Sequence, residues 1–325
     1  MAVAAARELG EESGLRRQRR LGRQASPGKP RRPKAGEQIA AWTFLTPGVA
    51  LIMLFGVAPV IWSAVMSFQR NNLFSPNTPF VGLANYRQML HDPIVGQAIE
   101  HTIVYTALFV PGTMLVGLFL GVAMNRPLKF ISVYRTAAYA TIAISTISEA
   151  LVFIWLFDPS YGIVNYLFSL VHIPQQQFLS SPSEALYVIV IMTIWGWTGF
   201  AVVVYLAALQ GIPQVLTEAA AIDGAGRWAT FRRITLPLLS PASLFLAVWL
   251  TINALQLFDE VYFSTSGGPL NSTTVLVYYL YEQAFGGANF NFGYASAIAY
   301  FLFIVIIVIT AIQFRAGRRF VHYRS

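Results

Sequence analysis

Long apolar runs separated by short polar segments make up most of this chain. A helix must be about 20 residues long to cross the roughly 30 Å hydrocarbon layer of a bilayer. Six runs satisfy that length, near 40–68, 98–124, 136–157, 185–209, 241–263 and 292–314. The pattern therefore predicts an all-α fold, a polytopic membrane bundle of six transmembrane helices.

Composition supports lipid as the solvent for these runs. Charged residues make up 11% of the chain and hydrophobic residues 56%, whereas a soluble domain has roughly 25% charged residues. The chain has no cysteine, which excludes disulfides, thiolate metal sites and cysteine catalysis. Its four histidines are scattered without ligand spacing, so we expect no metal site: His91, His101, His172 and His322.

Positive charge is concentrated at the N-terminus. Residues 1–38 hold ten of the Lys and Arg residues, among Gly, Pro and Gln, which predicts a disordered basic tail before a transmembrane domain over 39–325. Attraction to anionic membrane lipids is one use for such a tail. The alternative is a solvated tail with no specific partner. We favour both over binding of nucleic acid.

The distribution of basic residues also predicts the orientation. With both termini in the cytoplasm, the inner segments 1–38, 125–135, 210–240 and 315–325 contain 20 of the 22 Lys and Arg residues. The outer loops contain the other two, Arg70 and Arg87. Cytoplasmic loops are enriched in these residues, so the sequence predicts an N-in, C-in topology.

The cytoplasmic segment between the fourth and fifth spans has a helix–turn–helix pattern. Pro213 suits a first helical turn, and Gln214 to Ile222 favours helix. Asp223-Gly224 then reads as a helix stop. A second short helix is expected from Arg227 to Thr235, ending at Leu236-Pro237. The segment combines apolar positions with charged ones, so we interpret it as a docking element for a soluble partner.

This segment resembles a known motif. Glu218-Ala219-Ala220, Gly224, Ile234 and Leu236-Pro237 match the EAA loop of bacterial ABC importer permeases at each defining position. The resemblance implies the type I importer fold, a place in the bacterial cytoplasmic membrane, and a coupling helix within loop 210–240 that seats in the ATP-hydrolysing subunit. The coupling residues it implies are Glu218, Ala219, Ala220, Asp223, Gly224, Arg227 and Phe231.

Two further segments resemble the carbohydrate-type permeases, the group of the maltose and glycerol-3-phosphate importers. One is Phe80 to Tyr86 and the other runs from Phe258 to Phe285. Ser266 stands where such permeases often have a third glycine before Gly267-Gly268-Pro269. The resemblance implies three kinds of partner: a second permease subunit, two ATP-binding subunits and an extracytoplasmic solute-binding protein.

A nucleotide site is not encoded in this chain. A P-loop requires Gly-Lys followed by Ser or Thr, and none of Lys29, Lys34 and Lys129 has that context. ATP and Mg²⁺ are therefore expected on separate ATPase subunits. This chain would be a non-catalytic transmembrane subunit.

Polar residues within the spans are candidates for the solute pathway. Glu149 lies near the middle of the third span, where a charge is costly and often functional. It would either accept hydrogen bonds from solute hydroxyls or tie helices together.

Three polar residues share a spacing of three in the fifth span: Asn253, Gln256 and Asp259. On one helix they would lie on one face. In the carbohydrate-type permeases that the chain resembles, part of the sugar contact comes from this helix and from the helix that matches 193–200. Trp197 and Phe200 of that second helix could stack on a sugar ring. Hydrogen bonding between helices is the alternative role for the amides.

The sequence thus favours the permease of an ABC importer for a sugar or glycerophosphate-like solute. An importer permease for a non-carbohydrate solute remains an alternative. An ion-driven secondary carrier would need paired intramembrane charges or broken repeats, and an intramembrane enzyme would need a convergent catalytic set. Neither pattern is found in the sequence.

Overall fold

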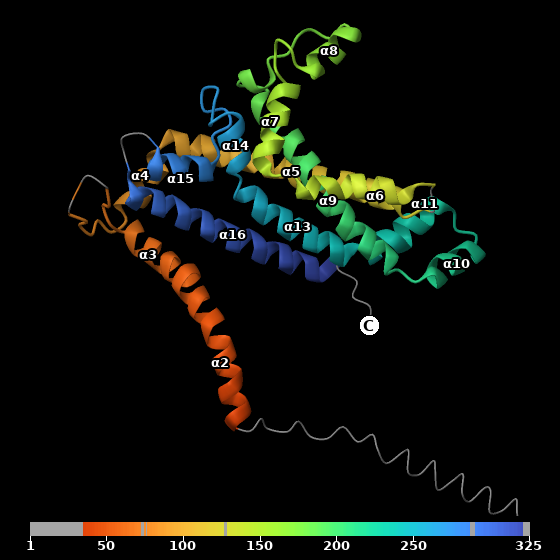
Figure 1. The fold of residues 1–325 in the computed structure, drawn as a ribbon, viewed down its shortest axis with the longest axis horizontal. Helices are drawn as coiled ribbons and strands as arrows, with labels where there is room; N and C mark the ends of the chain where they lie inside the picture. The colour runs from red at the N-terminus through yellow and green to blue at the C-terminus, as the bar shows by residue number, and fades with distance from the viewer. Residues whose placement is uncertain (1–34, 73–74, 76, 127–128, 287–289, 321–325) are drawn as a thin grey trace, which may run out of the picture. The chain divides into compact units, whose positions relative to one another are not determined.

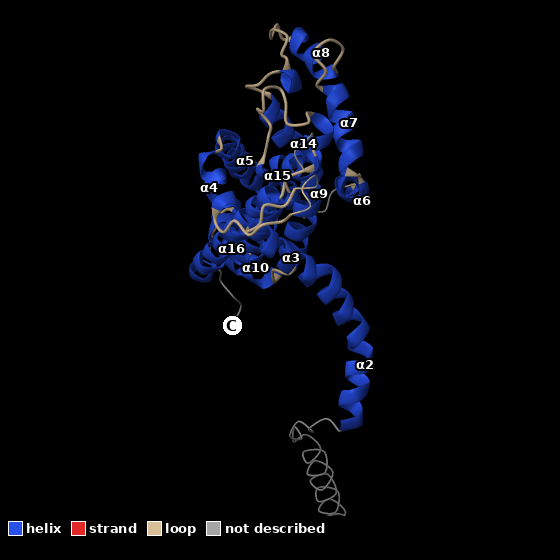
Figure 2. Cartoon of the chain, turned by 90° about the vertical axis from the view of Figure 1, so that its left-hand side faces the viewer, coloured by secondary structure: helices blue, strands red, loops and turns tan. Residues whose placement is uncertain are grey.

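The computed structural model describes residues 35–72, 75, 77–126, 129–286 and 290–320. Most of the predicted basic tail lies outside the described residues. The chain divides into two units, Met1–Val60 and Ile61–Ser325. Throughout the described part, helices and loops account for the structure and no strand forms beyond isolated bridges (Figure 2).

The described part of the first unit is one apolar helical segment. It comprises α2 (Ala35–Leu51), a π-helical turn η1 (Ile52–Val57) and the start of α3 (Ala58–Ser67). The π turn ends two residues before Pro59, whose ring would clash with the carbonyl four residues earlier in a regular α-helix. Side chains from Trp42 to Val60 are exposed, as expected for a span that meets lipid or another subunit.

The second unit contains the remaining helices (Figure 1). Its first half comprises α4 (Ala84–His91), α5 (Pro93–Met124), α6 (Ile131–Ala140), η2 (Thr141–Ala143), α7 (Thr146–Leu156), α8 (Ile163–Leu170), η3 (Phe178–Ser180) and α9 (Ala185–Gln210). Its second half comprises α10 (Gln214–Ile222), α11 (Arg227–Thr230), η4 (Phe231–Thr235), α12 (Leu236–Leu238), α13 (Ser240–Leu255), α14 (Asp259–Ser264), α15 (Leu276–Phe285) and α16 (Phe292–Phe320).

The central pair of this unit is α5 and α9, which pack along each other. Small residues allow the close approach: a Cβ added at Gly117 would lie 2.4 Å from the Cβ of Ala201, and one at Gly121 would lie 3.2 Å from that of Tyr205. Glycines four residues apart are typical of tightly packed transmembrane helices. The helix α13 packs against α5 and also against α16.

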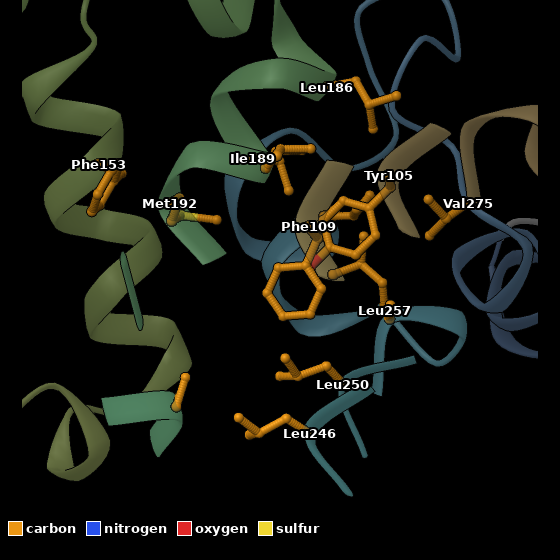
Figure 3. Packing of buried hydrophobic residues seen from close by; sticks show 14 of the residues in the cluster. Tyr105, Phe109, Phe153, Leu186, Ile189, Met192, Leu246, Leu250, Leu257 and Val275 are labelled. Carbon is orange, nitrogen blue, oxygen red and sulfur yellow. The ribbon is translucent and has the colours of Figure 1, made fainter. Parts of the chain in front are cut away.

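The apolar core lies between these helices. Tyr105 and Phe109 of α5 stack at 5.3 Å between ring centroids. They are buried among Ile189 and Met192 of α9 and Leu250 of α13 (Figure 3). The helices α10 and α11 lie at one end of this bundle, and α4 and α15 lie at the other (Figure 1). This placement separates the predicted docking element from the loops that the sequence predicts to be outside.

Helix length and hydropathy agree with a multi-pass membrane protein. Within the described residues, four helices are long and apolar enough to cross a bilayer: Trp42–Ser67, Pro93–Met124, Ala185–Gln210 and Phe292–Arg318. Two bent pairs raise the number to six if each pair counts as one span, namely Ile131–Ala143 with Thr146–Leu156 and Arg227–Leu238 with Ser240–Leu255.

Two predicted spans are therefore not the continuous helices that the sequence suggested. The third, expected over 136–157, bends by 104° between Ala143 and Thr146, because Ile144 and Ser145 adopt extended backbone conformations. The fifth, expected over 241–263, ends at Leu255, and the chain resumes helix only at Asp259.

Candidate functional site

The helix α10 is held at its end by a specific hydrogen-bonded turn. Gly224 has a positive φ of 75°, and its amide donates to the Ala221 carbonyl at 3.1 Å. The amide of Ala225 donates to the Ala220 carbonyl at 2.9 Å. These two bonds form a Schellman motif, in which glycine takes the left-handed position without a Cβ penalty. The predicted helix Gln214–Ile222 and its stop at Asp223-Gly224 are confirmed.

The second helix of this element runs further than the sequence suggested. Its predicted end at Leu236-Pro237 is wrong, because helix continues through α11, η4 and α12 to Leu238. The segment η4 is π-helical and ends two residues before Pro237. A wider turn accommodates a proline ring that a regular α-helix would not. The chain then bends by 61° into α13.

The helix–turn–helix presents apolar side chains to its surroundings. Ile222 is 87% exposed, Trp228 71% and Val215 70%. Of the coupling residues implied by the sequence, five are exposed, namely Glu218, Ala219, Asp223, Gly224 and Arg227. Ala220 is buried and Phe231 is half-buried, so these two hold the element together. Exposed apolar groups rimmed by polar ones are typical of an interaction surface.

A second feature is an aromatic wall that we define by Trp197 and Phe200 of α9 and Phe245 and Trp249 of α13. The rings of Trp197 and Phe200 meet edge to face at 5.9 Å. The ring centroid of Phe200 lies 6.1 Å from that of Trp249 and 6.4 Å from that of Phe245. Phe245 and Trp249 stack at 6.1 Å and keep 47% and 45% of their surface exposed. Exposed stacked rings offer a flat apolar surface beside the core.

Glu149 lies close to the same part of α9. Its carboxylate lies against Gly196, where an added Cβ would come within 2.5 Å of both oxygens. The side chain is buried and its Oε1 has no hydrogen-bond partner among the described residues. Glu260 lies on α14, which packs against α7. A buried carboxylate with an unused acceptor can receive a hydrogen bond from a solute.

Comparison with known proteins identifies the family to which this architecture belongs. Residues 113–322 match the family model of the binding-protein-dependent transport system inner membrane component. The chain is 34% identical over 252 residues to the lactose transport system permease protein LacF of Rhizobium radiobacter, covering 76% of this chain and 84% of the relative. The chain belongs to this family of ABC transporter permeases.

Two further likenesses cover nearly the whole permease. The sn-glycerol-3-phosphate transport system permease protein UgpA of Yersinia pestis is 31% identical over 295 residues, which is 90% of this chain and 99% of the relative. A chain of a bacterial ABC transporter involved in the import of the acidic polysaccharide alginate superposes with a TM-score of 0.74 at 26% identity. That match covers 87% of this chain and 96% of the other, and supports the importer permease fold.

The permease does not place Asn253, Gln256 and Asp259 on one helix face, as their spacing had suggested. Gln256 caps the C-terminus of α13 and Asp259 begins α14, so the helical register is lost between them. The amide of Asn253 donates to the Trp249 carbonyl one turn earlier at 2.8 Å. Asn253 thus remains beside the aromatic wall, whereas the other two belong to the break between helices.

Sequence reasoning missed three residues that the permease brings to this region. Phe245 and Trp249 precede Asn253 at spacings of four, a signal that places all three on one face of α13. Both are apolar residues inside a run of transmembrane length, so nothing in the sequence distinguished them from ordinary membrane-facing residues. Glu260 was missed because α14, which carries it, packs against α7 only as a result of the break after Leu255.

Proposed function

We propose that this permease carries a sugar or a glycerophosphate-like solute inward across the cytoplasmic membrane of a bacterium, driven by ATP hydrolysis in separate subunits. The observation that carries the proposal is the exposed helix α10, fixed by the turn at Gly224 and presenting Val215 and Ile222 beyond the bundle. A rigid helix with an apolar outer face is suited to enter a groove of a soluble partner.

The partners follow from the same proposal. Two ATP-binding subunits would supply ATP and Mg²⁺ and engage the coupling residues of α10 and α11. A second permease subunit would complete the pathway, and an extracytoplasmic solute-binding protein would deliver the solute. A bacterial alginate ABC transporter of similar fold has been solved in complex with its alginate pentasaccharide-bound periplasmic protein. This chain itself would perform no chemical step.

The aromatic wall supports a carbohydrate as solute. Aromatic rings pack against the C–H faces of sugars, and amides such as that of Asn253 pair with hydroxyl groups. Glu149 would accept a hydroxyl hydrogen bond close to the same helix. The names of relatives agree, because they describe permeases for lactose and for sn-glycerol-3-phosphate.

Uptake measured in cells that carry the complete system tests this function. Labelled lactose, maltose and sn-glycerol-3-phosphate would be compared in cells with the intact ATPase and in cells whose ATPase lacks its P-loop lysine. We expect uptake of one of these solutes, and its loss in the ATPase variant. Uptake that persists in the variant and follows an ion gradient would instead favour a secondary carrier.

A further inference from the structure

A groove of about 1300 Å³ lies between the last turns of α5 and the segment from α10 to η4. Pockets for small molecules typically enclose roughly 300–1,000 Å³, so this groove is large for a soluble metabolite. The basic-residue distribution places this end of α5 at the cytoplasmic surface of the membrane. Its depth is therefore that of the lipid headgroups and the adjoining acyl chains.

One wall of the groove is a stripe along α5. Leu115, Leu118, Phe119, Val122 and Ala123 line it, at the spacings of three and four that keep residues on one helix face. Leu115 and Phe119 are 67% and 72% exposed. A stripe of this length offers a continuous apolar track parallel to the helix.

The opposite wall contains an exposed tryptophan. Trp228 lines the groove and stacks on Phe231 at 5.7 Å between ring centroids. Tryptophan is enriched where hydrocarbon meets headgroups, because its ring is apolar and its N–H is polar. Thr217, Thr230 and Thr235 add hydroxyl groups to the same wall.

Positive charge completes the groove. Arg126 lies two residues beyond the end of α5 at Met124, and Arg227 begins α11; both line the groove and are exposed. The described residues that line the groove include no carboxylate. The end of α5 is also held in place, because Arg135 of α6 donates from Nη2 to the Met124 carbonyl at 2.9 Å.

We propose that this groove binds one anionic phospholipid of the inner leaflet. Its phosphodiester would lie between the guanidinium groups of Arg126 and Arg227, and an acyl chain would follow the α5 stripe. Guanidinium groups pair well with phosphate oxygens. A soluble phosphate would leave the apolar walls in water, and a purely apolar occupant would leave the two positive charges without a counter-charge.

Lipid retention by the purified full-length complex tests this site directly. The probe is spin-labelled phosphatidylglycerol in nanodiscs of phosphatidylcholine, with the motionally restricted fraction as readout. Each basic residue near an anionic surface contributes about fivefold in affinity, so Arg126→Gln should lower binding about fivefold and Arg126→Gln with Arg227→Gln about thirtyfold. Labelled phosphatidylcholine should show no change between variants.

Matched controls separate this site from general surface charge. Arg232→Gln with Arg233→Gln removes the same charge from exposed neighbours that do not line the groove, and should leave binding unchanged. Ala123→Phe would obstruct the apolar track with both arginines intact, and should also weaken binding.

Four results would overturn the proposal. One is equal loss in the Arg232 and Arg233 control, which would mean that the charge effect is general. Another is unchanged binding in the Arg126 and Arg227 double variant. A third is displacement of the labelled lipid by millimolar glycerol phosphate, which would assign the groove to a soluble anion. The last is binding by the permease alone but not by the assembled transporter, which would assign it to a protein partner.

Arg227 also belongs to the proposed coupling residues. The readout is therefore lipid binding rather than transport, and Arg126 lies outside the coupling loop. A failure of the coupling proposal would leave these binding results unaffected.

Discussion

The carboxylate of Glu149 on α7 lies directly against Gly196 of α9, with no room for a Cβ between them. Gly196→Ala would place a methyl group 2.5 Å from both carboxylate oxygens. The carboxylate ends a flexible side chain and can shift, so we expect a cost near the lower end of the overpacking range, about 1 kcal/mol. We expect a lower midpoint of thermal unfolding for the purified complex and slower uptake.

A second substitution tests whether the effect of Gly196→Ala comes from the contact with Glu149. In a Glu149→Ala background the added methyl group has space, so the penalty of Gly196→Ala should largely disappear. Gly96→Ala is the control, because no atom lies within 4 Å of a Cβ added there. A penalty of the same size in both backgrounds would show that the contact does not limit packing.

The turn at Gly224 gives a second prediction. Its φ of 75° costs a residue with a Cβ about 1–2 kcal/mol, so Gly224→Ala should loosen the end of α10. Hydrogen exchange of the Ala225 amide, which bonds the Ala220 carbonyl, should accelerate, and less solute should be carried per ATP hydrolysed. Gly226 has a φ of −68°, so Gly226→Ala should change neither quantity.

The aromatic wall gives a third prediction. Trp249→Ala would remove a ring whose centroid lies 6.1 Å from those of both Phe200 and Phe245. An aromatic contact contributes about 0.5–1.5 kcal/mol beyond burial, so we expect uptake at low solute concentration to fall roughly two- to tenfold. Trp155→Ala removes a ring of α7 that is 70% exposed and outside the wall. Equal losses in the two variants would mean that the wall does not contact solute.

Asp92, which lies between α4 and α5, predicts a pH dependence of stability. Its Oδ2 accepts from the hydroxyls of Tyr279 at 2.6 Å and Tyr294 at 2.7 Å, and its Oδ1 from the Ile94 amide at 3.0 Å. Burial opposes ionisation, but these hydrogen bonds outweigh it and the pKa of Asp92 falls below its usual value.

Because the folded carboxyl has the lower pKa, its stabilising effect is present above the unfolded pKa of about 3.9 and is lost as pH falls through the folded value. We expect Asp92→Asn to destabilise the complex by about 1.5–3 kcal/mol at pH 7. The difference from the natural chain should shrink in acid, as measured by thermal unfolding. A difference that stays constant with pH would argue against an ionised Asp92.

The regular parts of the fold could be predicted because local signals agreed there. The apolar run over 185–209 matches α9 within one residue, and Asp223-Gly224 ended α10 where its turn chemistry indicated. The break at Ile144 and Ser145 was harder to predict. Ser145 and Thr146 are typical of a helix start, but they lie inside a run long enough for one span.

The candidate site, too, could be predicted only in part, because some of its residues come together only through helix packing. Trp197 and Phe200 were expected in the solute pathway, and the structure places them together in the aromatic wall. Phe245 and Trp249 look like ordinary membrane residues until the pairing of α9 with α13 brings their rings to Phe200. The spacing argument for Gln256 and Asp259 failed because it assumed a continuous helix, which no local signal contradicted.

The central claim is that α10 is the contact through which ATP hydrolysis in a partner moves this permease. The most direct measurement places a photo-crosslinking amino acid at Ile222, which is 87% exposed on α10, and at Leu270, which is 88% exposed in the predicted outer loop. In transport-competent membranes, Ile222 should give a covalent adduct with the ATP-binding subunit and Leu270 should give none. An adduct from Leu270, or no adduct from Ile222 while transport continues, would contradict the account.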